Sequence, residues 1–166
     1  MATNELSWIK TAKDLLGVAE VKGAKHNPTI QKMLKYLGAW WNDDETAWCG
    51  VFTAYCLKLN GVKIPKHWYR AKDYLNYGAK LSKPCYGCIA VKSRVGGGHV
   101  CFIVGITPQG KLVGLGGNQS NKVCYALYDA KDFEQFRWYG KTSTPLQERY
   151  TLPILTNVTA TRVTEA

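Results

Sequence analysis

The sequence predicts an α+β domain in which N-terminal helices pack on a central antiparallel β-sheet of about five strands. Apolar residues recur at helical spacing in the first half of the chain, whereas the second half reads as short strands separated by turn residues. Helices that precede the strands, rather than alternate with them, indicate an antiparallel sheet. The 166 residues suffice for one domain with a proper core. We expect this domain over residues 1–141, followed by a threonine-rich peripheral extension or tail over residues 142–166.

Four helices are expected, and their ends carry recognisable signals. They span residues 6–16, 28–37, 47–59 and 71–77. Gly17 follows the first helix, and Asn27 and Pro28 supply the N-cap and first turn of the second, which Gly38 ends. The apolar stripe of the third helix places Cys49 at its N-terminal end, on the side that faces the core.

Five strands are expected in the second half of the chain. They span residues 89–92, 99–106, 111–115, 123–127 and 133–138. Strand 99–106 is apolar on both faces, which indicates a central position in the sheet. The turn at residues 107–110 contains Pro108 and Gly110 and favours a type I turn with a bulge, so the strands on either side should form a hairpin.

Cys49 and His99 together predict nucleophilic catalysis. On the first turn of a helix, unpaired backbone N–H groups and the positive end of the helix dipole stabilise a thiolate and lower its pKa. A histidine at the start of a separate strand can take the thiol proton and return it to a leaving amine. Either residue alone is more often structural, whereas the pair suggests a cysteine hydrolase of the papain-like kind.

A third residue should orient the histidine. In the predicted hairpin, His99 lies opposite Asn118 if residue 107 pairs with residue 110, and opposite Gln119 if residue 107 pairs with residue 111. Directly opposed side chains are about 5 Å apart at Cβ, so an amide lies beside the imidazole in both registers. The register alone does not decide between Asn118 and Gln119.

The charge of the chain favours a polyanionic partner. Twenty-two Lys and Arg residues against twelve Asp and Glu give a net charge of +10. Nucleic acid, anionic lipid and an anionic cell wall would all be attracted, and the alternative is a basic surface without a partner. The basic residues are scattered singly, which favours an extended polymer over base-specific recognition. The sequence lacks a stretch of about 20 apolar residues and the pattern of a secretory signal, so we expect cytoplasmic synthesis and no stable membrane insertion.

The six cysteines are expected to be reduced in that compartment. Cys85 and Cys88 have the spacing of a metal or redox motif, but no second pair accompanies them. We interpret them as small buried side chains at a tight turn around Gly87, and we expect no metal and no cofactor.

Three segments of the chain carry a family resemblance. Residues 44–52 read DETAWCGVF, residues 96–100 read GGGHV, and residues 116–120 read GGNQS. In this order they resemble the DETPWCAAF, GGGHVG and GGNQS motifs of phage and bacterial peptidoglycan hydrolases related to the CHAP and NlpC-type papain-like enzymes. The resemblance runs from about Trp8 to Gly140. It departs from the family pattern at Ala47, where a proline is typical, and at Cys88, which replaces an acidic residue.

The resemblance implies a papain-like fold and a bacteriolytic hydrolase, an endolysin that cuts an amide bond of bacterial peptidoglycan. Cys49 would be the nucleophile, His99 the base and acid, and Asn118 the orienting amide. We expect Trp48, Gly98 and Gln119 to line the substrate cleft, because their neighbours place them at its rim. The enzyme would be a monomer that acts on the cell wall after release from the host cytoplasm. Both a peptide cross-link and the muramoyl–alanine bond remain open as the bond cut, so the enzyme is an endopeptidase or an amidase.

Three other functions compete with this prediction. A wall-binding module could hold glycan or peptide in the same cleft without cutting it. An interbacterial amidase toxin would use the same chemistry in another biological setting. A nucleic-acid-binding protein is disfavoured, because the sequence has no basic cluster with interleaved aromatic residues and no recognition-helix motif.

Overall fold

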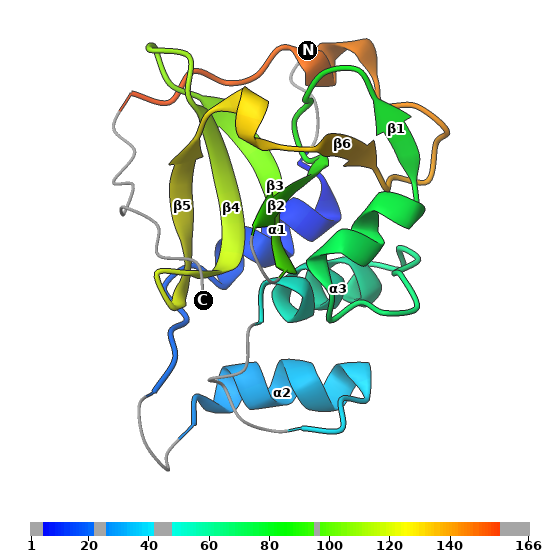
Figure 1. Cartoon of the computed structure of the whole chain (residues 1–166), viewed down its shortest axis with the longest axis vertical. Coiled ribbons are helices and arrows are strands. Elements are labelled where there is room, and N and C mark those ends of the chain that lie inside the picture. Colours follow the sequence, from blue (N-terminus) through cyan, green and yellow to red (C-terminus); the bar gives the residue numbers. More distant parts are fainter. Residues whose placement is uncertain (1–4, 22–25, 42–47, 95–96, 157–166) are drawn as a thin grey trace.

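The computed structural model describes residues 5–21, 26–41, 48–94 and 97–156, except for the side chain of Arg94. Within these ranges, three α-helices and three short 3-10 helices accompany one six-stranded antiparallel sheet, so the chain has an α+β fold (Figure 1). The helices are α1 (Ser7–Asp14), α2 (Pro28–Leu37), α3 (Cys49–Leu59), η1 (Ala71–Asn76), η2 (Ala130–Asp132) and η3 (Gln147–Tyr150). The strands are β1 (Ala79–Leu81), β2 (Ile89–Arg94), β3 (Gly97–Ile106), β4 (Leu112–Gln119), β5 (Lys122–Tyr128) and β6 (Gln135–Trp138).

The sheet has the strand order β1-β6-β2-β3-β4-β5, and every neighbouring pair is antiparallel. Strand β3 lies between β2 and β4, as its two apolar faces predicted, and residues 99–105 of this strand are all buried. Strand β1 was not expected. It has only three residues and pairs with β6 at the edge of the sheet, and so short a segment carries too little alternation to be recognised.

The helix ends follow the capping signals in the sequence. The Asn27 side chain accepts hydrogen bonds from the backbone N–H groups of Thr29, at 2.7 Å, and Ile30, at 3.4 Å. Gly38 ends α2 with φ 76°, a left-handed conformation that glycine adopts without steric cost. The fourth expected helix is present as the 3-10 helix η1, and Ala47, the expected start of α3, lies outside the described residues.

Helix α3 is buried along nearly its whole length, since every residue from Cys49 to Leu57 is buried. It packs on β3 and β4 and also contacts α1 and α2. In Figure 1, α1 lies behind the sheet and α2 lies furthest from it, beyond α3. Cys49 is therefore held by a helix that has neighbours on the sheet side and on the α2 side.

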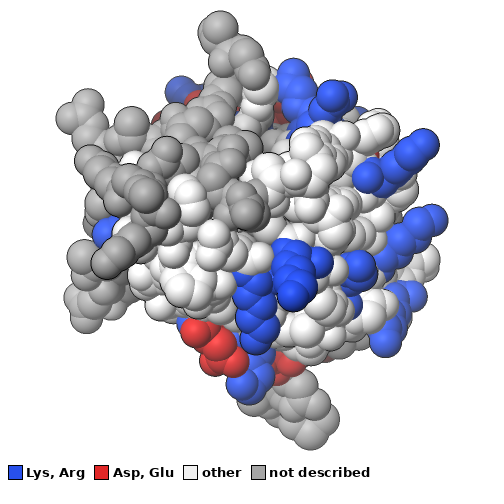
Figure 2. Space-filling view, turned by 90° about the horizontal axis from the view of Figure 1, so that it is seen from below, with Lys and Arg blue, Asp and Glu red and all other residues white. Residues whose placement is uncertain are grey.

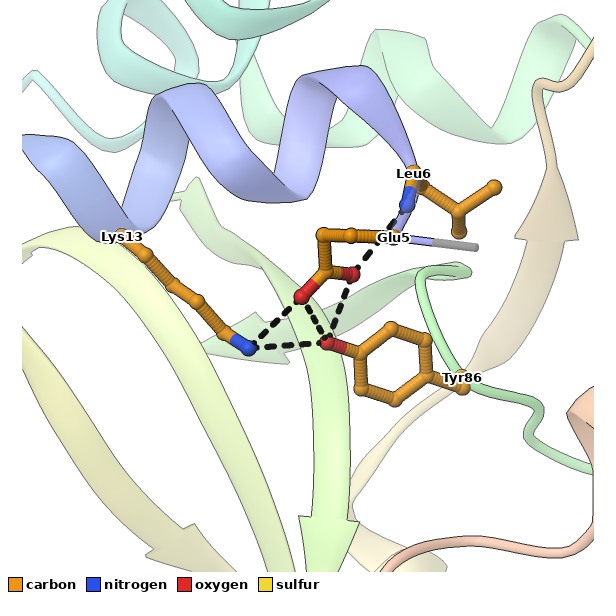
Figure 3. Close-up of polar contacts among 4 residues, drawn as sticks. All are labelled: Glu5, Leu6, Lys13 and Tyr86. Atoms are coloured by element: carbon orange, nitrogen blue, oxygen red, sulfur yellow. Dashed lines mark hydrogen bonds and ion pairs between the residues drawn. The ribbon is translucent and has the colours of Figure 1, made fainter. Parts of the chain in front are cut away.

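Helix α1 is hydrogen-bonded to the turn that leads into β2. The indole N–H of Trp8 donates to the carbonyl of Gly87 at 3.0 Å. The Glu5 carboxylate accepts hydrogen bonds from Lys13, at 2.8 Å, and from the Tyr86 hydroxyl, at 2.9 Å, and Lys13 also donates to Tyr86 at 3.0 Å (Figure 3). This network joins both ends of α1 to the segment before β2.

The described part of the C-terminal extension packs on the domain. The backbone N–H of Ile106 donates to Pro153 O, and the N–H of Leu155 donates to Ile106 O, each at 2.9 Å. Earlier in the extension, the carbonyl of Arg149 accepts a hydrogen bond from the backbone N–H of Tyr86 at 2.7 Å. Residues up to 156 thus form an extension attached to the end of β3, and residues 157–166 lie outside the described part. None of the described helices has the length and apolar character that a membrane-spanning helix needs.

Candidate active site

Cys49 is the first residue of α3 and is almost enclosed, with 7% of its surface exposed. The first hydrogen bond of the helix runs from Phe52 N–H to Trp48 O at 3.0 Å, so the N–H groups of the first turn have no carbonyl partner within the helix. Two backbone N–H groups, from Gly50 and Val100, point at the Cys49 sulfur. These donors and the helix dipole favour a negative charge on that atom.

His99 lies at the start of β3, is 2% exposed, and hydrogen-bonds to Cys49. Burial opposes ionisation of both groups, but their mutual contact outweighs it. The pKa of Cys49 is consequently below its usual value, because burial, which would raise it, is overcome by the His99 hydrogen bond and charge. The pKa of His99 is well above its usual value, because contacts with Cys101 and Cys49 overcome the effect of burial. Both directions favour a thiolate–imidazolium pair.

Gln119 holds the other side of the imidazole. Its Oε1 lies 3.0 Å from Nε2 of His99 and accepts a hydrogen bond from the Tyr128 hydroxyl at 2.8 Å. Its Nε2 donates to the carbonyls of Gly114, at 3.2 Å, and Cys124, at 2.7 Å. Because carbonyl oxygens only accept, the amide cannot be reversed, and Nε2 of His99 must carry a proton. In the neutral ring, Nδ1 is then the nitrogen that can accept the thiol proton.

Three departures from regular strand pairing explain why Gln119, and not Asn118, contacts the histidine. Near the turn, Thr107 N–H donates to Lys111 O, the bulged register. A second irregularity between Ile103 and Gly105 then shifts β3 by one residue, a register that would place Asn118 opposite His99. A further irregularity on β4, between Gly116 and Gln119, shifts the register of this strand. The Gln119 side chain then reaches the imidazole of His99.

The structure therefore corrects the assignment of Asn118 as the orienting amide. Asn118 is 2% exposed and has φ 56°, a left-handed conformation that is uncommon outside glycine. Its Oδ1 is buried and has no hydrogen-bond partner among the described residues. Of the two amides that the hairpin register left open, Gln119 is the one in contact with His99, and the bulge that brings it there has no local signal in the sequence.

Two of the three residues expected to line the cleft are in the core. Trp48 is 1% exposed and its indole N–H donates to Glu20 at 2.8 Å, and Gln119 is fully buried. Both support the site from within, which corrects the expectation that they line a cleft. Gly98 is half-buried, and a Cβ on it would lie 2.9 Å from Lys92 O and 3.3 Å from Lys72 Cγ. Its lack of a side chain lets neighbouring segments approach the start of β3.

Cys101 is a site residue that the sequence argument missed. It lies two positions after His99 on β3, is fully buried, and hydrogen-bonds to the imidazole. Its position in a continuous apolar strand gave no signal beyond that of a packing residue. The spacing of two along a strand could have found it, because residues i and i+2 share one face of a sheet.

One loop touches both halves of the candidate site. A Cβ on Gly50 would lie 2.4 Å from Trp68 O, and the Tyr74 hydroxyl donates to the carbonyls of Gly50, at 2.8 Å, and Trp68, at 3.0 Å. Ala71, which follows the same loop, lies against Gly98. Residues 68–72 thus lie against both the residue after Cys49 and the residue before His99.

Two described cavities lie away from Cys49 and His99. One of about 360 Å³ is bounded by Lys13, Tyr86 and Arg149, and another of about 440 Å³ by Lys63, Trp138 and Lys141.

Residues 42–47 and 95–96, which precede Trp48 and Gly97 in the chain, lie outside the described part. In the described part, no three His, Cys, Asp or Glu side chains are grouped so as to hold a metal ion. None of the six cysteines forms a disulfide.

Comparison with known proteins adds no identification: no protein-family model matches this sequence, and no curated protein matches it.

Proposed function

We propose that this protein is a cysteine hydrolase of papain-like fold that cleaves an amide bond of bacterial peptidoglycan. The observation that carries the proposal is the hydrogen-bonded series Cys49–His99–Gln119, in which the cysteine begins a helix and the histidine begins a central strand. A packing cysteine has no need of an imidazole, and a packing histidine has no need of a buried amide fixed by three other hydrogen bonds.

The chemistry follows from these contacts. The Cys49 thiolate attacks the carbonyl carbon of the scissile amide, and the carbonyl electrons move to oxygen. Backbone N–H groups at the start of α3 stabilise that oxyanion. When the tetrahedral intermediate collapses, the C–N bond breaks and His99 gives its proton to the departing amine. Water then attacks the thioester with His99 as base, which releases the acid and restores the thiolate. Throughout, Gln119 keeps the imidazole in place as a positioning residue.

The substrate class rests on the resemblance to peptidoglycan hydrolases and is supported by charge. Figure 2 shows Lys and Arg side chains outnumbering Asp and Glu on the face seen from below, in keeping with the net charge of +10. A diffuse positive surface attracts an extended anionic polymer such as a bacterial cell wall. By the same resemblance, we infer that the protein is made in a host cytoplasm and acts on the wall after release.

Digestion of purified peptidoglycan tests the proposal. We expect the wild-type protein to release soluble fragments and the variants Cys49→Ala and His99→Ala to lose about 10⁴-fold or more of this activity while remaining folded. Cys56→Ala is the matched control, because Cys56 is a buried thiol about two turns further along the same helix. Mass spectrometry of the fragments assigns the bond as a cross-link or a muramoyl–alanine amide.

Undiminished digestion by Cys49→Ala would refute covalent catalysis. Co-sedimentation of wild-type protein with peptidoglycan, without soluble fragments, would indicate a binding module instead.

A further inference from the structure

Four aromatic side chains gather beside the candidate site, and we call them the aromatic cluster: Trp40, Trp41, Trp68 and Tyr69. The ring centroids of Trp40 lie 4.6 Å from those of Trp41 and 4.9 Å from Tyr69, both edge to face. Trp41 stacks on Trp68 at 5.9 Å with an interplanar angle of 25°. Two segments far apart in sequence, one after α2 and one after α3, therefore meet through their rings.

One member of the cluster, Trp40, is exposed to water to an unusual degree, whereas the other three are half-buried. Trp40 is 74% exposed, the highest value among the large exposed apolar side chains of the described residues. A tryptophan ring is among the most costly groups to leave in water, and such surface commonly marks a binding site. Contacts with Trp41 and Tyr69 hold the Trp40 ring, so little conformational entropy would be lost when a ligand covers it.

Two members of the cluster belong to a loop that lies against the chain neighbours of Cys49 and His99. Trp68 and Tyr69 belong to the loop whose backbone lies against Gly50, the residue after the nucleophile. The same loop continues into Ala71 and Lys72, which lie against Gly98, the residue before the base. A polymer whose scissile bond reaches Cys49 would pass within reach of these rings.

The groups around the cluster define the chemistry of its ligand. The Arg70 guanidinium lies 5.6 Å from the centre of the Tyr69 ring, and Arg70 and Lys72 are exposed cations. On the other side, a hollow of about 350 Å³ beside Trp41 is also lined by Gln31, Leu34, Lys35 and Ala39. Flat aromatic faces with cationic, amide and ammonium groups nearby suit a ring that has an apolar C–H face, polar edges and acidic substituents.

We propose that the aromatic cluster binds a sugar ring of the peptidoglycan glycan strand by stacking on Trp40, and so holds the strand while its peptide enters the active site. The C–H groups on one face of a pyranose carry partial positive charge, which the negative face of an indole attracts. Sugar hydroxyl and N-acetyl groups can hydrogen-bond to Gln31 and Lys35 at the hollow. The identity of the polymer rests on the proposed function, whereas the stacking itself does not require cleavage.

Binding to purified peptidoglycan tests this proposal in the Cys49→Ala background, where no cleavage disturbs the measurement. Adding Trp40→Ala should weaken co-sedimentation about tenfold or more, and Trp40→Phe should restore part of the loss. The control is Ile154→Ala, because Ile154 is 67% exposed on the C-terminal extension, away from the cluster. Because Trp40 is so exposed, its replacement should leave the thermal unfolding midpoint nearly unchanged.

A soluble probe separates sugar from peptide. We expect a tetramer of N-acetylglucosamine to change the tryptophan fluorescence of the Cys49→Ala protein and not that of the Cys49→Ala, Trp40→Ala protein. Equal peptidoglycan binding by the two proteins, or competition by free stem peptide and not by the sugar, would overturn the proposal. Competition by single-stranded DNA in place of the sugar would overturn it as well. Cleavage by wild-type protein is scored separately, so a failed stacking test leaves the hydrolase proposal standing, and the reverse also holds.

Discussion

A Cβ atom on Gly117 would lie 2.5 Å from the Cβ of Phe52, so the end of β4 rests directly on the first turns of α3. The same added atom would lie 2.9 Å from the Trp48 ring. Gly117 is the residue at which the strand that carries Gln119 meets the helix that carries Cys49. This close approach is therefore one of the contacts that set the distance between the nucleophile and the orienting amide.

Gly117→Ala should move the two halves of the site apart. An added methyl group in a packed interior costs about 1–3 kcal/mol in the free energy of unfolding. We expect that loss together with a fall in peptidoglycan digestion that persists at temperatures where the variant is fully folded. Chemical denaturation measures the first effect and a digestion assay the second.

Gly97→Ala is the matched control, because a Cβ there meets no atom within 4 Å. Normal digestion by folded Gly117→Ala would mean that this contact does not set the active-site geometry.

Replacement of Gln119 should separate catalysis from packing. Gln119→Ala leaves His99 without its orienting acceptor and removes the acceptor of the hydrogen bond from the Tyr128 hydroxyl. We expect kcat to fall about 10²-fold with little change in KM, and the free energy of unfolding to fall by about 2 kcal/mol. The split between kcat and KM distinguishes a positioning role from loss of substrate binding.

Asn118→Gly provides the comparison, since it removes the neighbouring buried amide while glycine accepts the left-handed φ of 56°. This variant should keep most of its activity. A larger loss for Asn118→Gly than for Gln119→Ala would restore Asn118 as the orienting residue.

The sequence was sufficient for the elements whose signals are local. The Asn27 cap, the glycine after α2 and the turn at Gly110 each depend on a few neighbouring residues, and all three are present. Gly110 has φ 88°, and its N–H donates to Thr107 O at 2.9 Å, as the turn residues predicted. The central place of β3 also follows from its own residues, since both of its faces are apolar.

Features that depend on tertiary packing were beyond the sequence argument. The bulge between Gly116 and Gln119 places a non-glycine residue in a left-handed conformation, which no local pattern signals. Trp48 was expected at a rim because it precedes Cys49, yet its indole is held in the core by Glu20, which is 28 positions away. Contacts between residues that are far apart in the sequence therefore decide whether a side chain lies in the core or at the surface.

Cys49 should be reactive at a pH where an ordinary thiol is protonated. Burial raises its pKa, but the hydrogen bond and charge of His99 lower it further than burial raises it. Below that lowered pKa the thiolate is lost, and above the raised pKa of His99 the imidazolium is lost. The reactive pair therefore exists between the two values, and alkylation of Cys49 by iodoacetamide should stay fast well below pH of about 8.5.

His99→Ala should greatly reduce this reactivity at neutral pH, because only the backbone N–H groups of Gly50 and Val100 then oppose the effect of burial on the thiol. Peptide mapping by mass spectrometry follows Cys49 separately, and Cys56, whose pKa burial raises well above its usual value, serves as an internal unreactive thiol. Equal alkylation of Cys49 in wild type and His99→Ala would show that the imidazole does not activate the sulfur.

Cys101→Ala should narrow the pH range of activity from its alkaline side. Burial lowers the pKa of His99, and among the groups that raise it the hydrogen bond with Cys101 comes first, ahead of Cys49. Without the Cys101 thiol the imidazolium loses its proton at lower pH, so the alkaline limb of digestion against pH moves down. The acidic limb, which reports the Cys49 thiol, should move little.

Cys56→Ala removes a fully buried thiol of equal size from α3 and should leave both limbs in place. An unchanged alkaline limb in Cys101→Ala, with Cys56→Ala behaving as wild type, would limit Cys101 to a packing role beside the histidine.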